Sequence, residues 1–259
     1  MGERTGYTPG TFSWTDLTTT DQQDAKRFYG ELFGWEAEDM PVGEGFFYSM
    51  MRLGGKDVAA ISPQPQQQRD AGAPPAWNSY ITVEDADEAL ERATALGATA
   101  HAPAFDVMEA GRMAVVQDPQ GAYFLPWQAR RQFGAALVNE PGAVVWNELQ
   151  SPDLDASAAF YRELFGWTVE PFADSPERYL SIKNQGPNNG GMRELNPPDA
   201  PPHWLVYFGA EDIDAALARV QELGGIKLAG PIDIGIAKIG VVQDPQGATF
   251  ALYAGELEP

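Results

Sequence analysis

Two segments of the sequence place a tryptophan two residues before a carboxylate: Trp14-Thr15-Asp16 and Trp146-Asn147-Glu148. Both segments are rich in β-branched and aromatic residues, which predicts strands. Side chains two residues apart share one face of a strand, so each indole and carboxylate would lie together. A carboxylate in apolar surroundings has a raised pKa and could act as an acid, a base or a partner for a cation. The alternative is a structural carboxylate that caps a loop or faces a basic residue such as Arg112 or Lys238.

Other groups able to do chemistry are scarce. The chain has no cysteine and two histidines, His101 and His203. The absence of cysteine excludes disulfides, thiolate metal sites and a cysteine nucleophile. Neither histidine lies in the context of a nucleophile elbow, and no glycine cluster has the spacing of a phosphate-binding or dinucleotide-binding loop. The catalytic residues therefore stay unknown, with Asp16 and Glu148 as the candidates.

Charge and length limit the kind of partner. The 259 residues carry a net charge of −20 and a pI of about 4.3. Such an acidic surface repels nucleic acid and anionic lipid. Residues 1–21 contain no apolar run of signal-peptide length, and no stretch reaches the ~18 apolar residues of a membrane span. We expect a cytoplasmic protein whose partner is a small molecule, with no nucleic acid or membrane partner.

Two motifs occur twice and indicate a duplicated domain. Phe-Tyr-x-Glu-Leu-Phe-Gly-Trp at 28–35 returns 132 residues later (28 to 160), and Val-Val-Gln-Asp-Pro-Gln-Gly-Ala at 115–122 returns 126 residues later (115 to 241). The first motif has the apolar stripe of an amphipathic helix and ends at a glycine, which predicts core packing without chemistry. The second places Asp118 and Asp244 in type I turns, which predicts a turn-making role.

The periodicity of the chain predicts the same order of elements in both halves. The predicted helices cover a segment capped by Thr20 or Asp21 and ended by Gly34, and residues 85–96, 155–165 and 212–223. The predicted strands are 11–20, 46–53, 58–61, 77–83, 99–101, 113–117, 122–127, 144–150, 179–183, 190–195, 204–209, 238–243 and 249–253, with 62–76 as a Pro/Gln-rich connection. This order predicts an α+β fold of two tandem domains, each built from paired βαβββ modules whose curved mixed sheets form a cup. The domains are placed at 1–130 and 140–259, with a linker at 131–139.

The strand followed by Phe-Tyr-x-x-Leu-Phe-Gly-Trp, and the Asp-Pro-x-Gly hairpin, resemble the vicinal oxygen chelate superfamily (glyoxalase, bleomycin resistance protein and extradiol dioxygenase). The resemblance covers nearly the whole chain, twice, and is strongest to tandem-domain members. It implies a scaffold that serves isomerases, oxygenases, transferases and non-enzymatic binding proteins.

Metal-using members of that superfamily carry a His or Gln about fifteen residues before the tyrosine of the helix motif, a His before the second helix, and a Glu shortly after the hairpin aspartate. In this chain the resemblance places those ligands at Trp14, Asn78, Leu125, Trp146, Leu205 and Ala251. Of these only Asn78 could ligate a metal, so we predict no metal and no cofactor.

The sequence therefore predicts a metal-independent small-molecule binding protein of glyoxalase/bleomycin-resistance type, with an aromatic or amphipathic ligand. The residues expected to line the cups are Trp14, Asp16, Asn78, Tyr123, Trp146, Glu148 and Tyr253. Further aromatic side chains, whose face the sequence leaves open, are Phe47, Tyr48, Tyr80, Tyr179 and Tyr207. One alternative is a lyase, isomerase or hydroxylase-like oxidoreductase that uses non-standard residues. Another is that one domain is purely structural, its cup filled by its own side chains. Because the tandem pair imitates the dimer of single-domain relatives, we expect a monomer or a homodimer.

Overall fold

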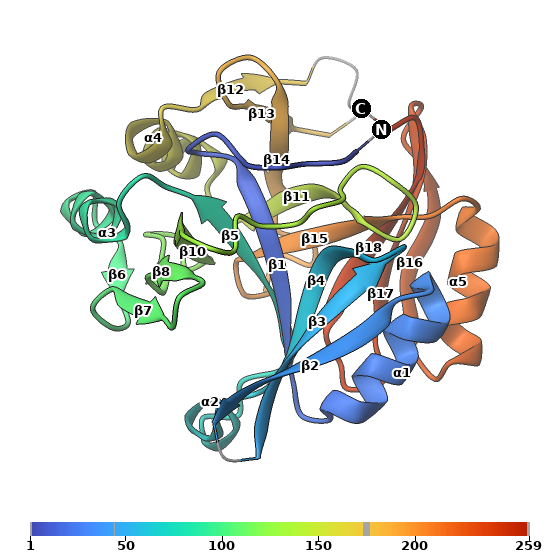
Figure 1. The fold of residues 1–259 in the computed structure, drawn as a ribbon. Coiled ribbons are helices and arrows are strands. Elements are labelled where there is room, and N and C mark those ends of the chain that lie inside the picture. Colours follow the sequence, from blue (N-terminus) through green and yellow to red (C-terminus); the bar gives the residue numbers. More distant parts are fainter. Residues whose placement is uncertain (1, 44, 173–176, 258–259) are drawn as a thin grey trace.

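Two curved mixed sheets, one from each half of the chain, form the framework of the computed structural model, which describes residues 2–43, 45–172 and 177–257 (Figure 1). The first sheet has the order β2-β3-β4-β1-β5-β10-β8-β7, with β9 on β10 and β6 on β9. Its strands are β1 (Phe12–Thr19), β2 (Glu36–Gly43), β3 (Phe46–Leu53), β4 (Lys56–Pro63), β5 (Ala76–Thr82), β6 (Thr99–Ala100), β7 (Phe105–Val107), β8 (Gly111–Met113), β9 (Val116–Gln117) and β10 (Tyr123–Ala129).

The second sheet repeats this plan with fewer interruptions. Its order is β12-β13-β14-β11-β15-β18-β17-β16. Its strands are β11 (Val144–Ser151), β12 (Thr168–Pro171), β13 (Tyr179–Lys183), β14 (Asn188–Glu194), β15 (His203–Gly209), β16 (Ile226–Asp233), β17 (Ala237–Gln243) and β18 (Thr249–Gly255). The helices are α1 (Gln22–Phe33), α2 (Gln66–Asp70), α3 (Ala86–Ala95), α4 (Leu154–Phe165) and α5 (Ile213–Glu222). The predicted α+β fold with curved mixed sheets is confirmed.

Five elements differ from the sequence prediction. Strands β2, β7, β12 and β16, and the short helix α2, were not expected. Every residue of β2 is exposed, so it has no alternation of apolar and polar side chains to reveal it. β16 contains the Gly230-Pro231 pair, which is typical of a turn. α2 lies within the Pro/Gln-rich connection, where the proline content favoured a loop.

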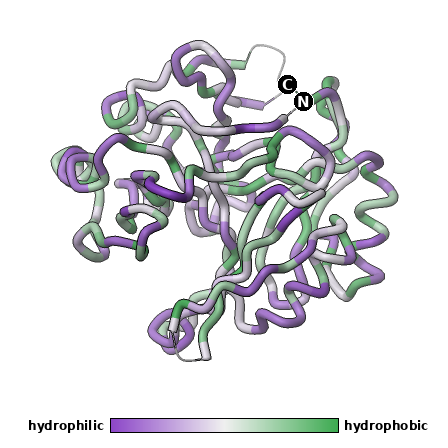
Figure 2. The backbone as a smooth tube through the Cα atoms, viewed as in Figure 1, coloured by the Kyte–Doolittle hydropathy of each residue, from purple (hydrophilic) through white to green (hydrophobic). Residues whose placement is uncertain are grey.

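The helix of the repeated motif is capped as its sequence predicts. The side chain of Asp21 accepts a hydrogen bond from the amide of Asp24, and Gly34 ends α1 in the left-handed region with a φ of 73°. Asp153 and Gly166 do the same for α4. Figure 2 shows hydrophilic and hydrophobic residues interleaved along α1, as an amphipathic helix requires.

Each half of the chain completes the core of the other half. The buried stripe of α1, with Phe28 and Tyr29, packs in one cluster with Phe208 and Phe250 of the second half. Likewise α4 packs with α3 and β10 of the first half, where Phe124 contacts Tyr161. α1 and α5 accordingly lie side by side (Figure 1). The opposite faces of the two sheets are the concave faces, called here the first and second cups.

Side chains fill the inner part of both cups. The buried residues of the first cup are Trp14, Ala60, Tyr80, Met113, Leu125, Trp127 and Ala135, the last from the segment between the sheets. Those of the second cup are Leu205, Tyr207, Ile239 and Ala251. Among the described residues, no helix has the length and apolar character needed to cross a membrane.

Candidate functional site

A hydrogen-bond network centred on Asp16 lies on the floor of the first cup. The carboxylate accepts bonds from the hydroxyls of Tyr80 (2.7 Å) and Tyr48 (3.0 Å) and from Nδ2 of Asn78 (2.8 Å). Nε1 of Trp14 donates to the Tyr48 hydroxyl over 2.9 Å. Trp14 and Asp16 therefore do share one face of β1, and Tyr48 links the indole to the carboxylate.

The second cup repeats the network around Glu148. The hydroxyl of Tyr207 donates to Oε1 over 3.0 Å, Nε2 of Gln150 donates to the same atom over 2.5 Å, and the Tyr179 hydroxyl is a further donor. Nε1 of Trp146 donates to Tyr179 over 2.8 Å. Both cups thus contain a Trp–Tyr–carboxylate–Tyr chain, and Gln150 supplies the amide that Asn78 supplies in the first cup.

A glycine makes room for the second network. Gly191 is the register partner of Glu148 on the neighbouring strand. A Cβ at Gly191 would lie 1.9 Å from the Tyr179 hydroxyl oxygen, a distance that no real side chain tolerates. The position equivalent to Gly191 in the first sheet is Ala60, the register partner of Asp16. Because Gly191 has no side chain, the Tyr179 hydroxyl that donates to Glu148 can lie directly against the backbone of β14.

Burial sets the protonation of both networks. Desolvation raises the pKa of Asp16 above its ordinary value, and the bonds from Asn78, Tyr80 and Tyr48 offset only part of that rise. Desolvation likewise raises the pKa of Glu148, partly offset by the charge of Arg193. Each cup therefore holds a carboxyl group that is shifted toward its neutral form.

The donor set of the cups does not fit a metal ion. Asn78, Tyr80 and Tyr48 all direct hydrogen atoms at Asp16, and the Tyr48 oxygen in turn accepts the indole N–H. A divalent metal needs several lone pairs converging on one point. Within residues 2–43, 45–172 and 177–257, no three His, Asp or Glu side chains are grouped to hold one. The absence of a metal stays a prediction, which the chemistry of these donors supports.

Of the basic partners suggested for the carboxylates, Arg112 was wrong, whereas Glu148 does have a basic residue near it. Arg112 binds Asp87 and Asp106 instead of Asp16. The basic residue that affects Glu148 is Arg193. His203 lies at the start of β15 with Nδ1 hydrogen-bonded to the Pro201 carbonyl.

Two predicted cup residues lie apart from the networks. Tyr123 is 45% exposed, and its ring packs on His101 with centroids 4.9 Å apart. Tyr253 packs at the edge of the second cup, and its hydroxyl donates to the carbonyl of Glu256. The other five predicted residues, Trp14, Asp16, Asn78, Trp146 and Glu148, belong to the two networks.

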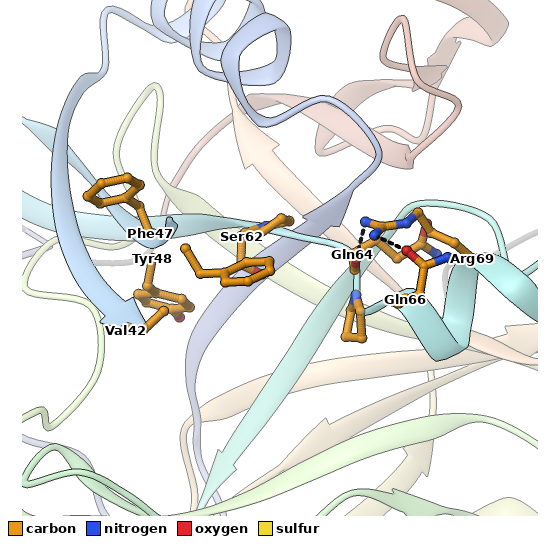
Figure 3. Close-up of a pocket in the computed structure, with 10 residues that line it drawn as sticks. Val42, Phe47, Tyr48, Ser62, Gln64, Gln66 and Arg69 are labelled. Carbon is orange, nitrogen blue, oxygen red and sulfur yellow. Dashed lines mark hydrogen bonds between the residues drawn. The ribbon is translucent and has the colours of Figure 1, made fainter. Parts of the chain in front are cut away.

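A cavity of about 430 Å³ opens at the outer end of the first cup (Figure 3). It is lined by Val42, Phe46, Phe47, Tyr48, Ser62, Pro63, Gln64, Pro65, Gln66 and Arg69. In Figure 3, Val42 and Tyr48 lie toward one end and Gln64, Gln66 and Arg69 toward the other, while the ring of Phe47 projects from the opposite side of β3 to that of Tyr48. Tyr48 therefore belongs both to the cavity wall and to the network around Asp16.

Side-chain size distinguishes the two cups at this end. In the first sheet, Thr18 is the register partner of Ser62 on β4 and of Ala76 on β5. In the second sheet, the matching register partners of Gln150 are Arg193 and His203. We call these rows the small row (Ser62, Thr18 and Ala76) and the large row (Arg193, Gln150 and His203). Ser62 of the small row lines the cavity, and its counterpart in the large row is the longer Arg193.

The cavity side formed by the 64–74 segment is polar. Gln64 is buried, and its Nε2 donates to the carbonyls of Ala73 (2.8 Å) and Pro74 (3.3 Å). Its Oε1 accepts no hydrogen bond from the described residues. The guanidinium of Arg69 donates to the Gln64 carbonyl and to Oε1 of Gln66.

Sequence reasoning missed Gln64, Arg69 and Gln150, and left the tyrosines unassigned. For the tyrosines a signal existed. Tyr80 is the register partner of Trp14, and side chains directly opposite each other on paired strands lie on the same face, which would have placed Tyr80 in the cup. Gln150 could have been found by the same alternation, since it follows Glu148 by two residues. For Gln64 and Arg69 the sequence held no such signal, because the connection has no periodicity.

Comparisons with known proteins agree with this architecture. Residues 11–124 match the model of the Glyoxalase/Bleomycin resistance protein/Dioxygenase superfamily, and residues 144–253 match a Glyoxalase-like domain. The chain is 43% identical to "Putative glyoxylase CFP32" of Mycobacterium tuberculosis, with 97% of both chains covered. It is 32% identical to "Anthracycline biosynthesis protein DauV" of a Streptomyces species, with 96% of this chain and 94% of that one covered.

Solved structures share the fold at lower identity. The Mn(II)-bound glyoxalase from Novosphingobium aromaticivorans superposes with a TM-score of 0.67 at 14% identity, covering 96% of this chain and 83% of that one. The 2,3-dioxygenase LapB from a Pseudomonas species gives a TM-score of 0.64 at 14% identity, with 98% and 96% covered. These two likenesses concern the fold alone.

Proposed function

Because the chain belongs to the glyoxalase/bleomycin resistance protein/dioxygenase superfamily, we propose that it is a metal-independent binding protein whose first domain holds a planar aromatic small molecule. The observation that carries this proposal is the cavity at the outer end of the first cup. Its volume of about 430 Å³ suits a ligand of two or three fused rings, since small-molecule sites commonly measure roughly 300–1,000 Å³.

The cavity walls favour a flat, apolar ligand. Phe46, Phe47 and Tyr48 offer ring faces, and Pro63 and Pro65 add rigid apolar surface. Phe46 is 57% exposed and Phe47 is 40% exposed, so both rings gain burial when a ligand covers them. Anthracyclines are polycyclic aromatic compounds, and the name of the Streptomyces relative agrees with this ligand class.

Metal independence is supported by the way the first cup uses its polar groups. The Asp16 carboxylate already accepts three hydrogen bonds, and its partners are donors. Ligand binding at the outer end requires none of these groups to change partners.

We assign to the second domain the structural role, in which its own side chains fill its cup. Its large row, with Gln150 bonded to Glu148, carries longer side chains at the positions of the small row in the first domain. Its helix α4 and turn at Asp244 meanwhile complete the cores shared with the first domain.

Catalysis is the second candidate, and one contact favours it. Tyr48 lines the cavity and donates to Asp16, whose pKa is raised by burial. A proton could pass between the buried acid and a ligand through the Tyr48 hydroxyl. Under this alternative, Asp16→Asn abolishes turnover of a ligand while its affinity is kept, and Glu148→Gln leaves turnover unchanged. Turnover that survives Asp16→Asn would eliminate it.

The proposal is tested by filling the cavity. Isothermal titration of a panel of two- and three-ring aromatic compounds should find ligands whose affinity is the same with chelator and with added Mn²⁺ or Zn²⁺. Ser62→Leu should weaken these ligands by at least about tenfold, because the new side chain occupies the cavity. Arg193→Leu, the same replacement in the large row, should leave their affinity unchanged. Equal binding to both variants, or binding that requires a divalent metal, would refute the proposal.

A further inference from the structure

We propose that the ligand of this cavity is an aromatic carboxylate and that Arg69 binds its carboxylate group. This inference rests on the proposed binding function and specifies its ligand class. Aromatic side chains and the Arg69 guanidinium line the same cavity, the former from β3 and the latter from α2 (Figure 3).

Unlike most arginines of the chain, Arg69 has no acidic partner within the part that the structure describes. Eight other arginines form ion pairs: Arg27, Arg52, Arg112, Arg130, Arg131, Arg178, Arg193 and Arg219. Among the described residues, Arg69 binds the Gln64 carbonyl over 2.6 Å and Oε1 of Gln66 over 2.5 Å, both neutral acceptors. In a chain with a net charge of −20, an arginine that lies beside a cavity, with no carboxylate partner among the described residues, is available to an external anion.

Asp70, which follows Arg69 directly in the sequence, does not form an ion pair with it. Its Oδ1 accepts a hydrogen bond from Nε2 of Gln66 over 2.6 Å. Gln66 therefore stands between the two, with its amide nitrogen on Asp70 and its amide oxygen on Arg69. Arg69 has five N–H donors, and the two bonds to Gln64 and Gln66 leave others for a ligand.

The segment that carries Arg69 is held in position before any ligand arrives. The amide of Gln64 donates to the carbonyl of Thr19 at the end of β1, over 2.8 Å. Its buried side chain donates to the carbonyls of Ala73 and Pro74 and so closes the loop around α2. Because Arg69 then binds the Gln64 carbonyl, the guanidinium is fixed at the cavity side, which lowers the entropy cost of binding.

A carboxylate on an aromatic ring matches this geometry. The planar guanidinium pairs with a planar carboxylate through parallel hydrogen bonds, while the ring lies against Phe46 and Tyr48, which share one face of β3. Aromatic compounds without a charge would use only the ring faces.

The experiment compares an acid with its neutral isostere on the full chain. Isothermal titration at pH 7 measures 2-naphthoate and 2-naphthamide, and anthracene-2-carboxylate and its amide, against the wild type, Arg69→Gln and Arg131→Gln. Arg131 is an exposed arginine paired with Glu109, so its variant controls for the loss of one positive charge. We expect each acid to bind the wild type and Arg131→Gln about fivefold more tightly than its amide, as for one partly exposed ion pair. In Arg69→Gln the acid should fall to the affinity of the amide, with the amide unchanged.

The outcomes separate this inference from the proposed function. If acid and amide bind the wild type equally, or if Arg69→Gln keeps the preference for the acid, the carboxylate assignment is overturned while aromatic binding stands. If none of the four compounds binds, both are overturned.

Discussion

The hydroxyl of Tyr29 donates a hydrogen bond to Oδ2 of Asp244 over 3.0 Å, joining the helix motif of the first domain to the hairpin turn of the second. The relation is reciprocal, since Tyr161 binds Oδ2 of Asp118 over 2.9 Å. The other carboxylate oxygen of each aspartate accepts backbone amides of its own turn, so the predicted turn-making role is also correct. The two motifs that revealed the duplication are therefore each other's partners across the domain boundary.

The first prediction concerns this pair of contacts. Tyr29→Phe and Tyr161→Phe should each lower the free energy of unfolding by about 1–3 kcal/mol, because each leaves a buried carboxylate oxygen and a buried indole N–H without a partner. Urea unfolding measures the change. Tyr123→Phe, at an exposed tyrosine, is the control and should change little. If the three variants unfold alike, the contacts contribute no stability.

The second prediction uses the pH dependence of stability. Burial raises the pKa of Asp16 above 3.8, so its ionisation destabilises the folded state as the pH rises through the raised pKa. Asp16→Asn cannot ionise at this position and so avoids this loss of stability. The free energy of unfolding of the variant, relative to that of the wild type, should therefore increase from pH 4 to pH 8. Chemical unfolding across this range provides the measurement.

An exposed aspartate gives the opposite sign and serves as the control for that experiment. Hydrogen bonds from Arg112 hold the pKa of Asp87 below its ordinary value. Asp87 therefore contributes stability above its unfolded pKa, and Asp87→Asn should lose stability relative to the wild type as the pH rises. Parallel profiles for Asp16→Asn and the wild type would contradict the assignment of a buried, destabilised carboxylate.

The third prediction concerns Gly191. In Gly191→Ala the new methyl group must displace the Tyr179 hydroxyl, which lies 1.9 Å from its position, and should lower the free energy of unfolding by about 1–3 kcal/mol. Since Trp146 donates to the same hydroxyl, its fluorescence emission should also shift. Ala60→Gly at the equivalent position of the first sheet should cost only about 0.5–1 kcal/mol, without an emission shift. An unchanged emission in Gly191→Ala would show that Tyr179 does not move.

The fourth prediction concerns metal. Millimolar Mn²⁺ or Zn²⁺ should leave the melting temperature of chelator-treated protein unchanged, because a ligand raises stability only when it binds the folded state. Elemental analysis of tag-free protein should find no stoichiometric metal. About one divalent ion per domain would contradict the donor chemistry derived for the cups.

The sequence was a good guide wherever one short segment carries its own signal. The repeats, the caps at Asp21 and Gly34 and the alternation at Trp14 and Asp16 predicted helices, strands and the face that the carboxylate shares. Elements without periodicity, such as β2 and α2, left no such signal. The pairing of Tyr29 with Asp244 depends on how two domains pack, which no local pattern records. The cavity lies between β3, the end of β4 and α2, and no local pattern records how these elements are placed relative to one another.

The contact between Tyr29 and Asp244 joins residues 215 positions apart, which has a consequence for biosynthesis. Residues of the first half cover part of the apolar stripe of α1, but the strand and turn that complete its cover are synthesised long after the helix. At typical translation speeds of 5–20 residues per second, the second-half residues that pack on this stripe are synthesised roughly 10–40 s after it. During that interval Phe28, Tyr29 and Phe33 lack their contacts with Phe250. The duplication that gives the finished protein its symmetry thus makes completion of the core around α1 depend on synthesis of the second half.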